Sequence, residues 1–293
     1  LRVVHASCNG AIIERKSAYT DGKLRRSPIE LLSSALMVTR EYENGIGIIT
    51  MRRAEKRNAL GPELVAALHE AILEFGSSND VRVIILRGDG PAFCAGADLA
   101  YLQQISENSV LENLDDSTAL KDMLLSIVKC PKPVIAEVHG PAIAGGCGLA
   151  SVCDIVIAGR QGASFGYSEV RIGFVPAIVL VFLLRKIGDT QARRLVLSAE
   201  NIDADTAHRI GLVTDVVEDV GLREYVLRLA STMAKNGSDA MALTKRMLTS
   251  LHGMSLEAGL DHATAMNALA RQTDECRDGI AKFVNKTSSK GNT

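Results

Sequence analysis

Apolar positions along the chain follow two periods, which separate predicted strands from predicted helices. Between Val38 and Met51, two short apolar stretches flank Asn44-Gly45, a dipeptide typical of a tight hairpin turn. Short apolar runs predict buried strands at Val81–Gly88, Pro133–Gly140 and Cys153–Gly159. These runs are separated by longer stretches of a different period, so the pattern indicates an α/β core.

The helical period, with apolar residues three and four positions apart, marks Leu60–Phe75 and Ser117–Val128. After residue 178 the same period dominates and predicts helices over Ile178–Ile187, Thr190–Leu197, Ala204–Ile210, Leu222–Lys235, Asp239–His252, Leu256–Ala270 and Glu275–Asn285. We therefore expect a core over residues 37–200 and a C-terminal helical subdomain over residues 201–293.

Residues 1–36 show neither period, and no Met precedes Met37. One interpretation is a disordered leader or non-native extension, and the other is an organelle transit peptide, because basic residues outnumber acidic ones. The turn signals Asn9-Gly10 and Asp21-Gly22 favour the first interpretation. We expect a cytoplasmic protein in the first case and a mitochondrial one in the second.

Composition narrows the class of protein. The chain has 293 residues, is 47% hydrophobic and carries a formal net charge of -1, so it provides no strong field for nucleic acid or anionic lipid. No uncharged apolar run is long enough to cross a bilayer. The 6 cysteines show no CxxC spacing, and we expect free thiols rather than disulfides or a metal site.

The stretch HGPAIAGGCGLASVCD (His139–Asp154) places glycines between a predicted strand and a helix that begins near Gly146. Such a turn aims free backbone N–H groups at an anion. The stretch completes neither the GxGxxG dinucleotide pattern nor the GxxxxGK[ST] phosphate loop. Glycines that only permit tight helix–strand packing remain the alternative interpretation.

Two further segments point to chemistry. GDGPAFCAGADL (Gly88–Leu99) also places small residues after a buried strand, so Ala97 and Gly145 are candidates for two converging N–H donors, an oxyanion hole. FGYSEVRIGFVP (Phe165–Pro176) places Glu169 among apolar neighbours. Partial burial raises a carboxyl pKa, as a general acid or base requires.

These segments, together with RAEKRNAL (Arg53–Leu60), FCAGADL (Phe93–Leu99) and HGPAIAGGCGLASVCDIVIA (His139–Ala158), resemble the enoyl-CoA hydratase/isomerase (crotonase) superfamily. The resemblance covers about Val38 to Lys286. It implies a crotonase-like spiral of ββα turns with a C-terminal helical trimerisation subdomain, assembled as a homotrimer or a hexamer (a dimer of trimers). It also implies acyl-CoA thioester substrates, with coenzyme A as part of the substrate, no metal and no separate cofactor.

The resemblance assigns roles by position. It implies that Ala97 and Gly145 are the oxyanion donors and Glu169 the catalytic carboxylate. It places the coenzyme A moiety near Arg57, Ala59, Ala95, Asp98, Leu99, Gly146, Phe283 and Lys286. Solvated charges at Arg57 and Lys286, and plain helix packing at Phe283, remain open alternatives.

Gly148 departs from the pattern, because two-glutamate hydratases have Glu at this position. We expect a vacancy there, filled by water or substrate. Since the segment Ser168–Gly188 resembles the methylglutaconyl-CoA hydratase-like branch, we favour a hydratase that adds water to a short or branched 2-enoyl-CoA, in fatty acid or branched-chain amino acid breakdown. A Δ3-Δ2 enoyl-CoA isomerase that uses one glutamate stays open. So do a second acid from Glu112 or Asp115-Asp116, and an RNA-binding or catalytically weak family member.

His139 and the acyl pocket complete these expectations. His139 ends a predicted strand, and we expect it to make a structural hydrogen bond. The stretches Tyr101–Asp116 and Ile178–Phe182 are expected to line the acyl pocket.

Overall fold

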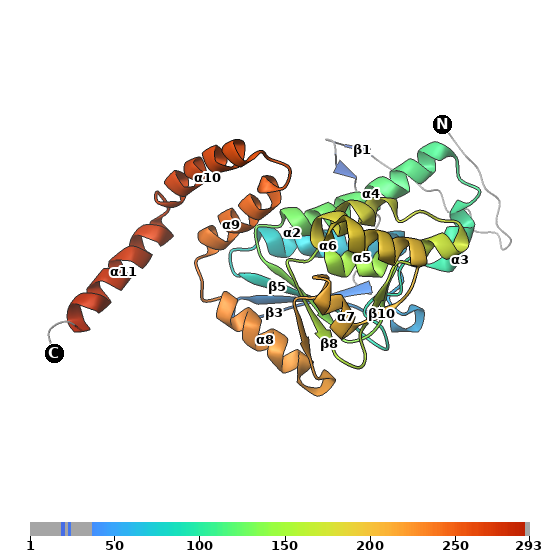
Figure 1. Ribbon diagram of the computed structural model, residues 1–293, viewed down its shortest axis with the longest axis horizontal. Helices are drawn as coiled ribbons and strands as arrows, with labels where there is room; N and C mark the ends of the chain where they lie inside the picture. Colours follow the sequence, from blue (N-terminus) through green and yellow to red (C-terminus); the bar gives the residue numbers. More distant parts are fainter. Residues whose placement is uncertain (1–18, 21–22, 25–36, 291–293) are drawn as a thin grey trace.

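A central sheet organises the chain (Figure 1). The computed structural model describes residues 19–20, 23–24 and 37–290, with all their side chains except those of residues 19–20, 23–24, Leu99 and 284–290. The 6-stranded sheet has the order β11-β8-β6-β5-β4-β3. Its strands are β3 (Val38–Glu43), β4 (Ile46–Met51), β5 (Val83–Gly88), β6 (Val134–Val138), β8 (Ile155–Gly159) and β11 (Asp215–Val217).

The sheet combines one hairpin with parallel strands. β3 and β4 pair antiparallel around Asn44-Gly45, and Val38 lies opposite Met51. The remaining neighbours pair parallel. Parallel strands covered on both faces read as continuous apolar runs, which is why β5, β6 and β8 were predictable from their composition. The strand predictions are confirmed.

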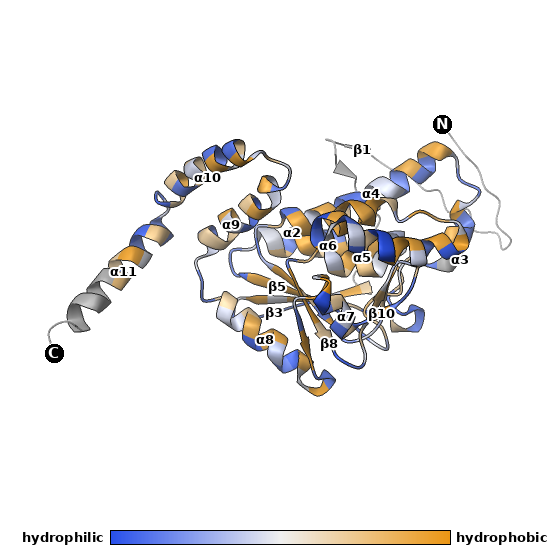
Figure 2. Cartoon of the chain, viewed as in Figure 1, coloured by the Kyte–Doolittle hydropathy of each residue, from blue (hydrophilic) through white to orange (hydrophobic). Residues whose placement is uncertain are grey.

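Alternate residues of the strands supply two hydrophobic clusters, one on each face. Ile84 and Leu86 of β5 belong to the larger cluster, under α2 (Pro62–Ser77) and α4 (Val110–Lys129). Val83 and Ile85 point to the opposite face, where α8 (Leu222–Met233) packs with Leu222, Val226 and Ala230. The apolar strands lie between helices that carry polar residues outward (Figure 2). Because successive side chains of a strand point to opposite faces of the sheet, one strand contributes residues to both hydrophobic clusters.

A second, 3-stranded sheet of the order β10-β9-β7 lies beside the functional motifs. β7 (Ala142–Ile143) pairs parallel with β9 (Ser164–Gly166), and β10 (Ile202–Asp203) pairs with β9. Helix α5 (Gly145–Ser151) follows β7, and α6 (Ala177–Ser198) packs against it. Strands of two or three residues carry no readable period, so sequence patterns did not predict this sheet.

The predicted helices are present in the structure, but several of them begin or end at other residues than predicted. Gly188 has φ 73° and interrupts α6, which explains the two separate periodic stretches predicted there. α4 begins at Val110 rather than Ser117, because Ser109 and Glu112 form a reciprocal capping box. The remaining short elements are β1 (Tyr19–Thr20), β2 (Lys23–Leu24), η1 (Ala54–Lys56), α3 (Leu99–Ile105), η2 (Glu169–Ile172), α7 (Ala204–Arg209) and η3 (Asp219–Gly221).

The last three helices extend from the core as an arm (Figure 1). They are α9 (Ser238–Leu251), α10 (Leu256–Ala270) and α11 (Asp274–Lys290). Lys245 of α9 is buried, and its Nζ donates to Asp154 (2.6 Å) and to the carbonyls of Ile127 and Lys132. This cluster fastens the arm to the core. Residues 202–233, beyond the expected division at residue 200, still pack on the core through β10, β11 and α8.

Other expectations concern thiols and membranes. The described cysteines, Cys94, Cys130, Cys147, Cys153 and Cys276, are free, as expected. Among the described residues, no helix has the length and apolar character that crossing a membrane requires. Apart from β1 and β2, the expectations for residues 1–36 lie outside the described residues.

Candidate functional site

Gly146, in the stretch 139–148, meets the backbone of the loop at residues 94–98. Cys94 N donates to Pro141 O at 3.2 Å, and Ile143 N donates to Cys94 O at 3.0 Å. A Cβ built on Gly146 would lie 2.1 Å from Cys94 O. Gly146 is therefore required because backbone passes directly over backbone, and no side chain fits between.

Two unpaired amides lie on these touching loops. Gly96 has φ +89°, and a Cβ built on it would lie 3.4 Å from Gly145 N. Ala144 holds φ 52° and ψ −125°, a sparsely populated conformation for a residue with a Cβ. Within the described part of the chain, neither Ala97 N nor Gly145 N donates to a protein acceptor. Two amides without a protein acceptor on neighbouring loops are a prerequisite for an oxyanion hole, so both remain candidates for that role.

The 94–98 loop rests on the turn Arg57–Leu60, which carries the RNAL motif. Ala95 N donates to Arg57 O (3.0 Å), Leu60 N to Gly96 O (2.6 Å) and Asp98 N to Leu60 O (2.9 Å). Arg57 and Asn58 both adopt left-handed φ values, 52° and 54°. The turn thereby points its carbonyls and amides at the loop and fixes the loop's path.

Asn58 is a site-supporting residue that motif reasoning missed. It is fully buried, its Nδ2 donates to the carbonyls of Asp89 (2.8 Å), Ala92 (2.9 Å) and Phe93 (3.2 Å), and its Oδ1 accepts from Arg53 N. These carbonyls lead directly into the 94–98 loop. The signal available in the sequence was an Asn at a turn, since Asn tolerates left-handed φ better than other side chains.

The structure places the proposed coenzyme A residues in different environments. Ala59 is buried, Ala95 is half-buried, and the exposed Arg57 guanidinium makes no ion pair within the described part of the chain. Asp98 is buried and engaged internally: it pairs with Arg53 (2.8 Å) and Lys56 (3.5 Å) and caps α3 through Ala100 N. The Asp98 side chain is therefore occupied by contacts within the chain.

The electrostatics of Asp98 agree with this internal role. Burial alone would raise the pKa of Asp98, but the Ala100 N–H and the cations of Arg53 and Lys56 outweigh it and hold the pKa below its usual value. The side chains of Leu99 and Lys286 lie outside the described residues, and Phe283 lies on the exposed arm, 75% accessible in the single chain.

Glu169 begins η2, shortly after β9, the strand that pairs with β7 beside Gly145. In the register of β7 and β9, Ile143 lies opposite Gly166, and Ala144 N donates to Gly166 O at 2.7 Å. Gly145 and Glu169 therefore follow the carboxyl ends of two paired parallel strands, where side chains and amides gather at one edge.

The Glu169 carboxyl is desolvated. The residue is 9% exposed, and its Oε2 atom is buried without a partner in the described structure. Burial raises the pKa of Glu169 above its usual value. Burial likewise raises the pKa of Cys147 to about 12, and the negative charge of Glu169 acts in the same direction. Helix α5 begins at Gly145, directly after β7, and β7 pairs with β9, the strand that leads to Glu169.

The vacancy expected at Gly148 is absent, and that prediction is wrong. A Cβ built on Gly148 would lie 2.1 Å from Cγ1 and 2.8 Å from Cβ of Val179 on α6. Side-chain packing, rather than water or substrate, occupies the space. Gly148 has no left-handed φ, so its lack of a side chain serves only this contact.

Two of the three alternative acids have structural roles. Glu112 accepts hydrogen bonds from Ser109 in the capping box, and Asp116 accepts from the Tyr101 hydroxyl at 2.6 Å. His139 Nε2 lies 2.9 Å from Gly90 O, the kind of structural hydrogen bond expected for it.

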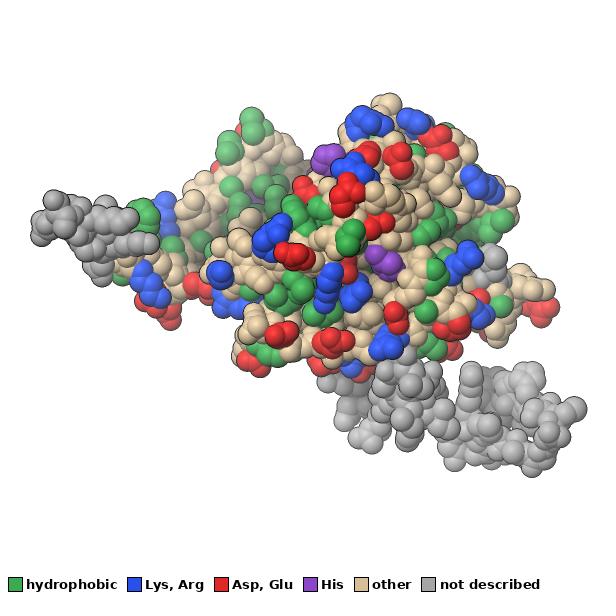
Figure 3. Space-filling view, turned by 90° about the horizontal axis from the view of Figure 1, so that it is seen from below, with side chains coloured by type: hydrophobic (Ala, Val, Ile, Leu, Met, Phe, Trp, Pro, Cys, Tyr) green, Lys and Arg blue, Asp and Glu red, His purple; other side chains and the backbone are tan. Residues whose placement is uncertain are grey.

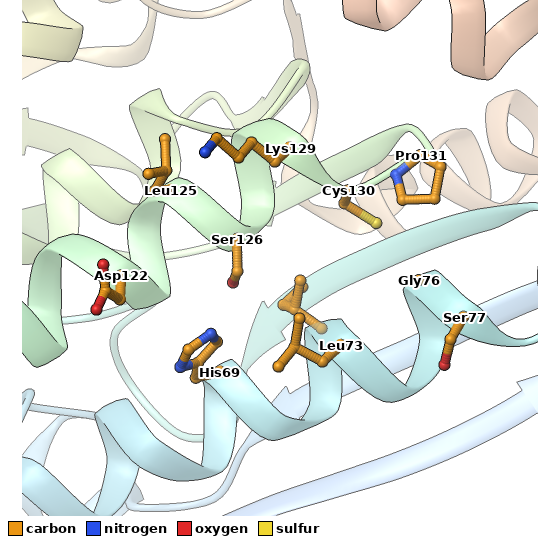
Figure 4. A pocket seen from close by; sticks show the side chains of 11 residues that line it. His69, Leu73, Gly76, Ser77, Asp122, Leu125, Ser126, Lys129, Cys130 and Pro131 are labelled. Atoms are coloured by element: carbon orange, nitrogen blue, oxygen red, sulfur yellow. The ribbon is translucent and has the colours of Figure 1, made fainter. Parts of the chain in front are cut away.

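A surface groove of about 490 Å³ between α2 and α4 lies apart from the motifs (Figure 4). Its lining includes His69, Leu73, Asp122, Ser126 and Lys129. None of its lining residues belongs to the motif segments Arg53–Leu60, Phe93–Leu99, His139–Ala158 and Phe165–Pro176.

Comparison with known proteins decides the family. The profile of the enoyl-CoA hydratase/isomerase family matches residues 41–290. The chain belongs to the enoyl-CoA hydratase/isomerase family. A Thermus thermophilus protein named for enoyl-CoA hydratase is 38% identical over 247 residues, which cover 84% of this chain and 97% of that protein. The 2,3-dehydroadipyl-CoA hydratase of Escherichia coli is 33% identical, over 86% of this chain and 96% of its own.

Solved structures of the family agree with the fold. An enoyl-CoA hydratase from Shewanella pealeana superposes with a TM-score of 0.82 at 29% sequence identity, covering 89% of this chain and 98% of that one. The prediction of a crotonase-like α/β fold is therefore confirmed, and the chain is an enzyme of the enoyl-CoA hydratase/isomerase family.

Replacing Asn58 tests how the 94–98 loop is held in this enzyme. In Asn58→Asp, an oxygen replaces the Nδ2 donor and faces three backbone carbonyls. We expect the free energy of unfolding to fall by about 3 kcal/mol, because buried acceptors lose their donor. Urea denaturation measures this, with Asn79→Asp on the exposed surface as control. An unchanged unfolding midpoint in Asn58→Asp would contradict the role assigned to Asn58.

Proposed function

We propose that this protein adds water to the 2,3 double bond of a 2-enoyl-CoA, with Glu169 as the proton-transfer group. The observation that carries the proposal is the desolvated Glu169 carboxyl, whose Oε2 atom has no partner in the described structure, together with the free amides of Ala97 and Gly145 on neighbouring loops. The names of the relatives, which include hydratases of enoyl-CoA and 2,3-dehydroadipyl-CoA, support the same reaction class.

One carboxylate suffices for the proton balance. Ionised Glu169 takes a proton from water while the water oxygen bonds to Cβ, and the π electrons move to the thioester oxygen. The amide N–H groups of Ala97 and Gly145 hold the resulting enolate oxygen, and each such donor is typically worth about 3 kcal/mol in a dry site. Glu169 then delivers its proton to Cα, which forms the 3-hydroxyacyl-CoA and restores the carboxylate.

Coenzyme A binding involves surfaces around the same loops. We propose that the exposed Arg57 guanidinium contacts a phosphate of the substrate, and that the backbone at Ala95 and Gly146 lines the path of the thioester arm. Phe283 and Lys286 on the C-terminal arm are proposed to close this site, either within one chain or from a neighbouring copy. The substrate brings the coenzyme A, and the proposal requires no separate cofactor.

We further propose a short or branched acyl chain for the substrate and a homotrimer or hexamer for the assembly. The resemblance of Ser168–Gly188 to the methylglutaconyl-CoA hydratase-like branch supports a short or branched acyl chain.

A homotrimer or hexamer is supported by exposed apolar residues on α6 and on the arm, such as Val181, Leu260 and Ile280. On the face shown in Figure 3, acidic and basic side chains are interspersed, which does not favour nucleic acid as the main partner.

A second candidate is a Δ3-Δ2 enoyl-CoA isomerase. The contact between Gly148 and Val179, which excludes a side chain at position 148, favours this candidate. In this reaction Glu169 removes a proton from C2 of a 3-enoyl-CoA and returns it to C4, while the amides hold the dienolate oxygen. The product is the conjugated 2-enoyl-CoA.

Glu169→Gln tests the proton-transfer role. The substitution keeps the size of the side chain and removes its titrating proton, so kcat should fall by roughly 10²–10⁴-fold. KM should change little, because the coenzyme A contacts remain. Steady-state kinetics on a 2-enoyl-CoA measures the change, with Glu257→Gln on exposed α10 as the control. Full activity of Glu169→Gln on every thioester would refute the mechanism.

A thioester panel separates the two reactions. With 2-enoyl-, 3-enoyl- and 3-methylglutaconyl-CoA, we expect hydration to be faster than migration of the double bond. In D₂O, hydration should place solvent deuterium at C2 of the product. Isomerisation of a C2-deuterated 3-enoyl-CoA would instead carry deuterium to C4. Faster migration than hydration would favour the isomerase, and no turnover at all would favour a catalytically weak or RNA-binding member.

The raised pKa of Glu169 predicts a pH-dependent stability difference. Because the folded pKa lies above the unfolded one, the neutral form is favoured in the fold, and this stabilisation is lost as pH rises through the folded pKa. Glu169→Gln should therefore be more stable than the parent near neutral pH, and the difference should vanish below about pH 4, the unfolded pKa region. Urea midpoints across this range measure it. A constant difference at all pH values would contradict the assigned desolvation.

A further inference from the structure

Gly148 and Val179 form a tightly complementary pair at the contact between α5 and α6. The contact involves both the Cγ1 and the Cβ atoms of Val179, at 2.1 Å and 2.8 Å from a Cβ built on Gly148. Gly148 lies within helix α5 and has no left-handed φ. Any L residue would suit its backbone conformation, so the space alone requires glycine.

Val179 has little freedom to move aside. It is 4% exposed and belongs to the main hydrophobic cluster. Its side chain is β-branched, and such a side chain has one strongly preferred χ1 rotamer in a helix. Rotation would move Cγ1 but not Cβ, which is itself too close. Relief would require a shift of α6 relative to α5, and α6 begins shortly after η2, the element that carries Glu169.

We propose that Val179 is a specificity-determining residue that keeps the site limited to one carboxylate. The chemical consequence rests on the proposed function, since it concerns the proton transfers of Glu169. With Val179 in place, a glutamate at position 148 cannot enter without displacing α6. With a glycine at position 179, the same glutamate gains room on α5, the helix that follows β7, while Glu169 follows the paired strand β9.

Unfolding measurements test the steric pair without reference to activity. Gly148→Ala should lower the urea midpoint, although alanine is the better helix former, and Gly148→Glu should lower it further. In the Val179→Gly background, both changes at position 148 should cause a much smaller loss. Gly279→Glu, at a helical glycine with open space around it, is the matched control for the glutamate substitution.

Kinetics of the double variant Gly148→Glu/Val179→Gly tests the effect on specificity. We expect the ratio of hydration to isomerisation to rise at least about tenfold, because a second group can then act on water. We also expect the pH profile of kcat/KM to gain a second ionisation, since two nearby carboxyls titrate as a coupled pair. A purely structural contact would not change the number of ionisations.

Three outcomes would overturn the proposal. They are an unchanged midpoint in Gly148→Glu, an equal loss with and without Val179, and a double variant that is folded but has the parent's reaction ratio and pH profile. Failure of the proposed function is separate: it would appear as full activity in Glu169→Gln, and it would leave the coupling of the unfolding midpoints intact.

Discussion

The site depends on one close approach between two backbones. The carbonyl of Cys94 lies where a side chain on Gly146 would begin, and a short parallel bridge between Cys94 and Ala142 holds the two segments in register. This approach brings the free amides of Ala97 and Gly145 onto touching loops. A side chain at position 146 would separate the loops, and with them the two free amides.

The surroundings of this approach are built to be stiff. The RNAL turn braces the 94–98 loop by backbone hydrogen bonds, and Asn58 satisfies three carbonyls that would otherwise be buried without donors. A buried polar group that is fully satisfied fixes one arrangement, because every alternative leaves donors or acceptors unpaired. Preorganised amides need no rearrangement when charge develops on a bound thioester.

Glu169 and Gly148 show two different uses of a dry interior. Burial of Glu169 stabilises its neutral form and makes its ionisation unfavourable, a state that a proton-transfer group can exploit and that lowers stability at neutral pH. At Gly148, the same dense packing excludes a side chain altogether, because Val179 of another helix fills the volume. Glycine is therefore required at positions 146 and 148 for different reasons. At 146 a backbone carbonyl leaves no room for a side chain, and at 148 a valine side chain does so.

The sequence by itself determined the long elements and the family. Runs such as Val83–Gly88, and the apolar period of α2 (Pro62–Ser77), reflect burial along one element, which the local sequence pattern records. The motifs likewise named Ala97, Gly145 and Glu169 before their neighbours were known. Only the tertiary structure decided how β7 and β9 pair, that Asn58 supports the site, and that Val179 fills the space beside Gly148. The physical reason is that these features are contacts between residues far apart in the chain, and no local period or spacing encodes which distant side chain will occupy a given volume.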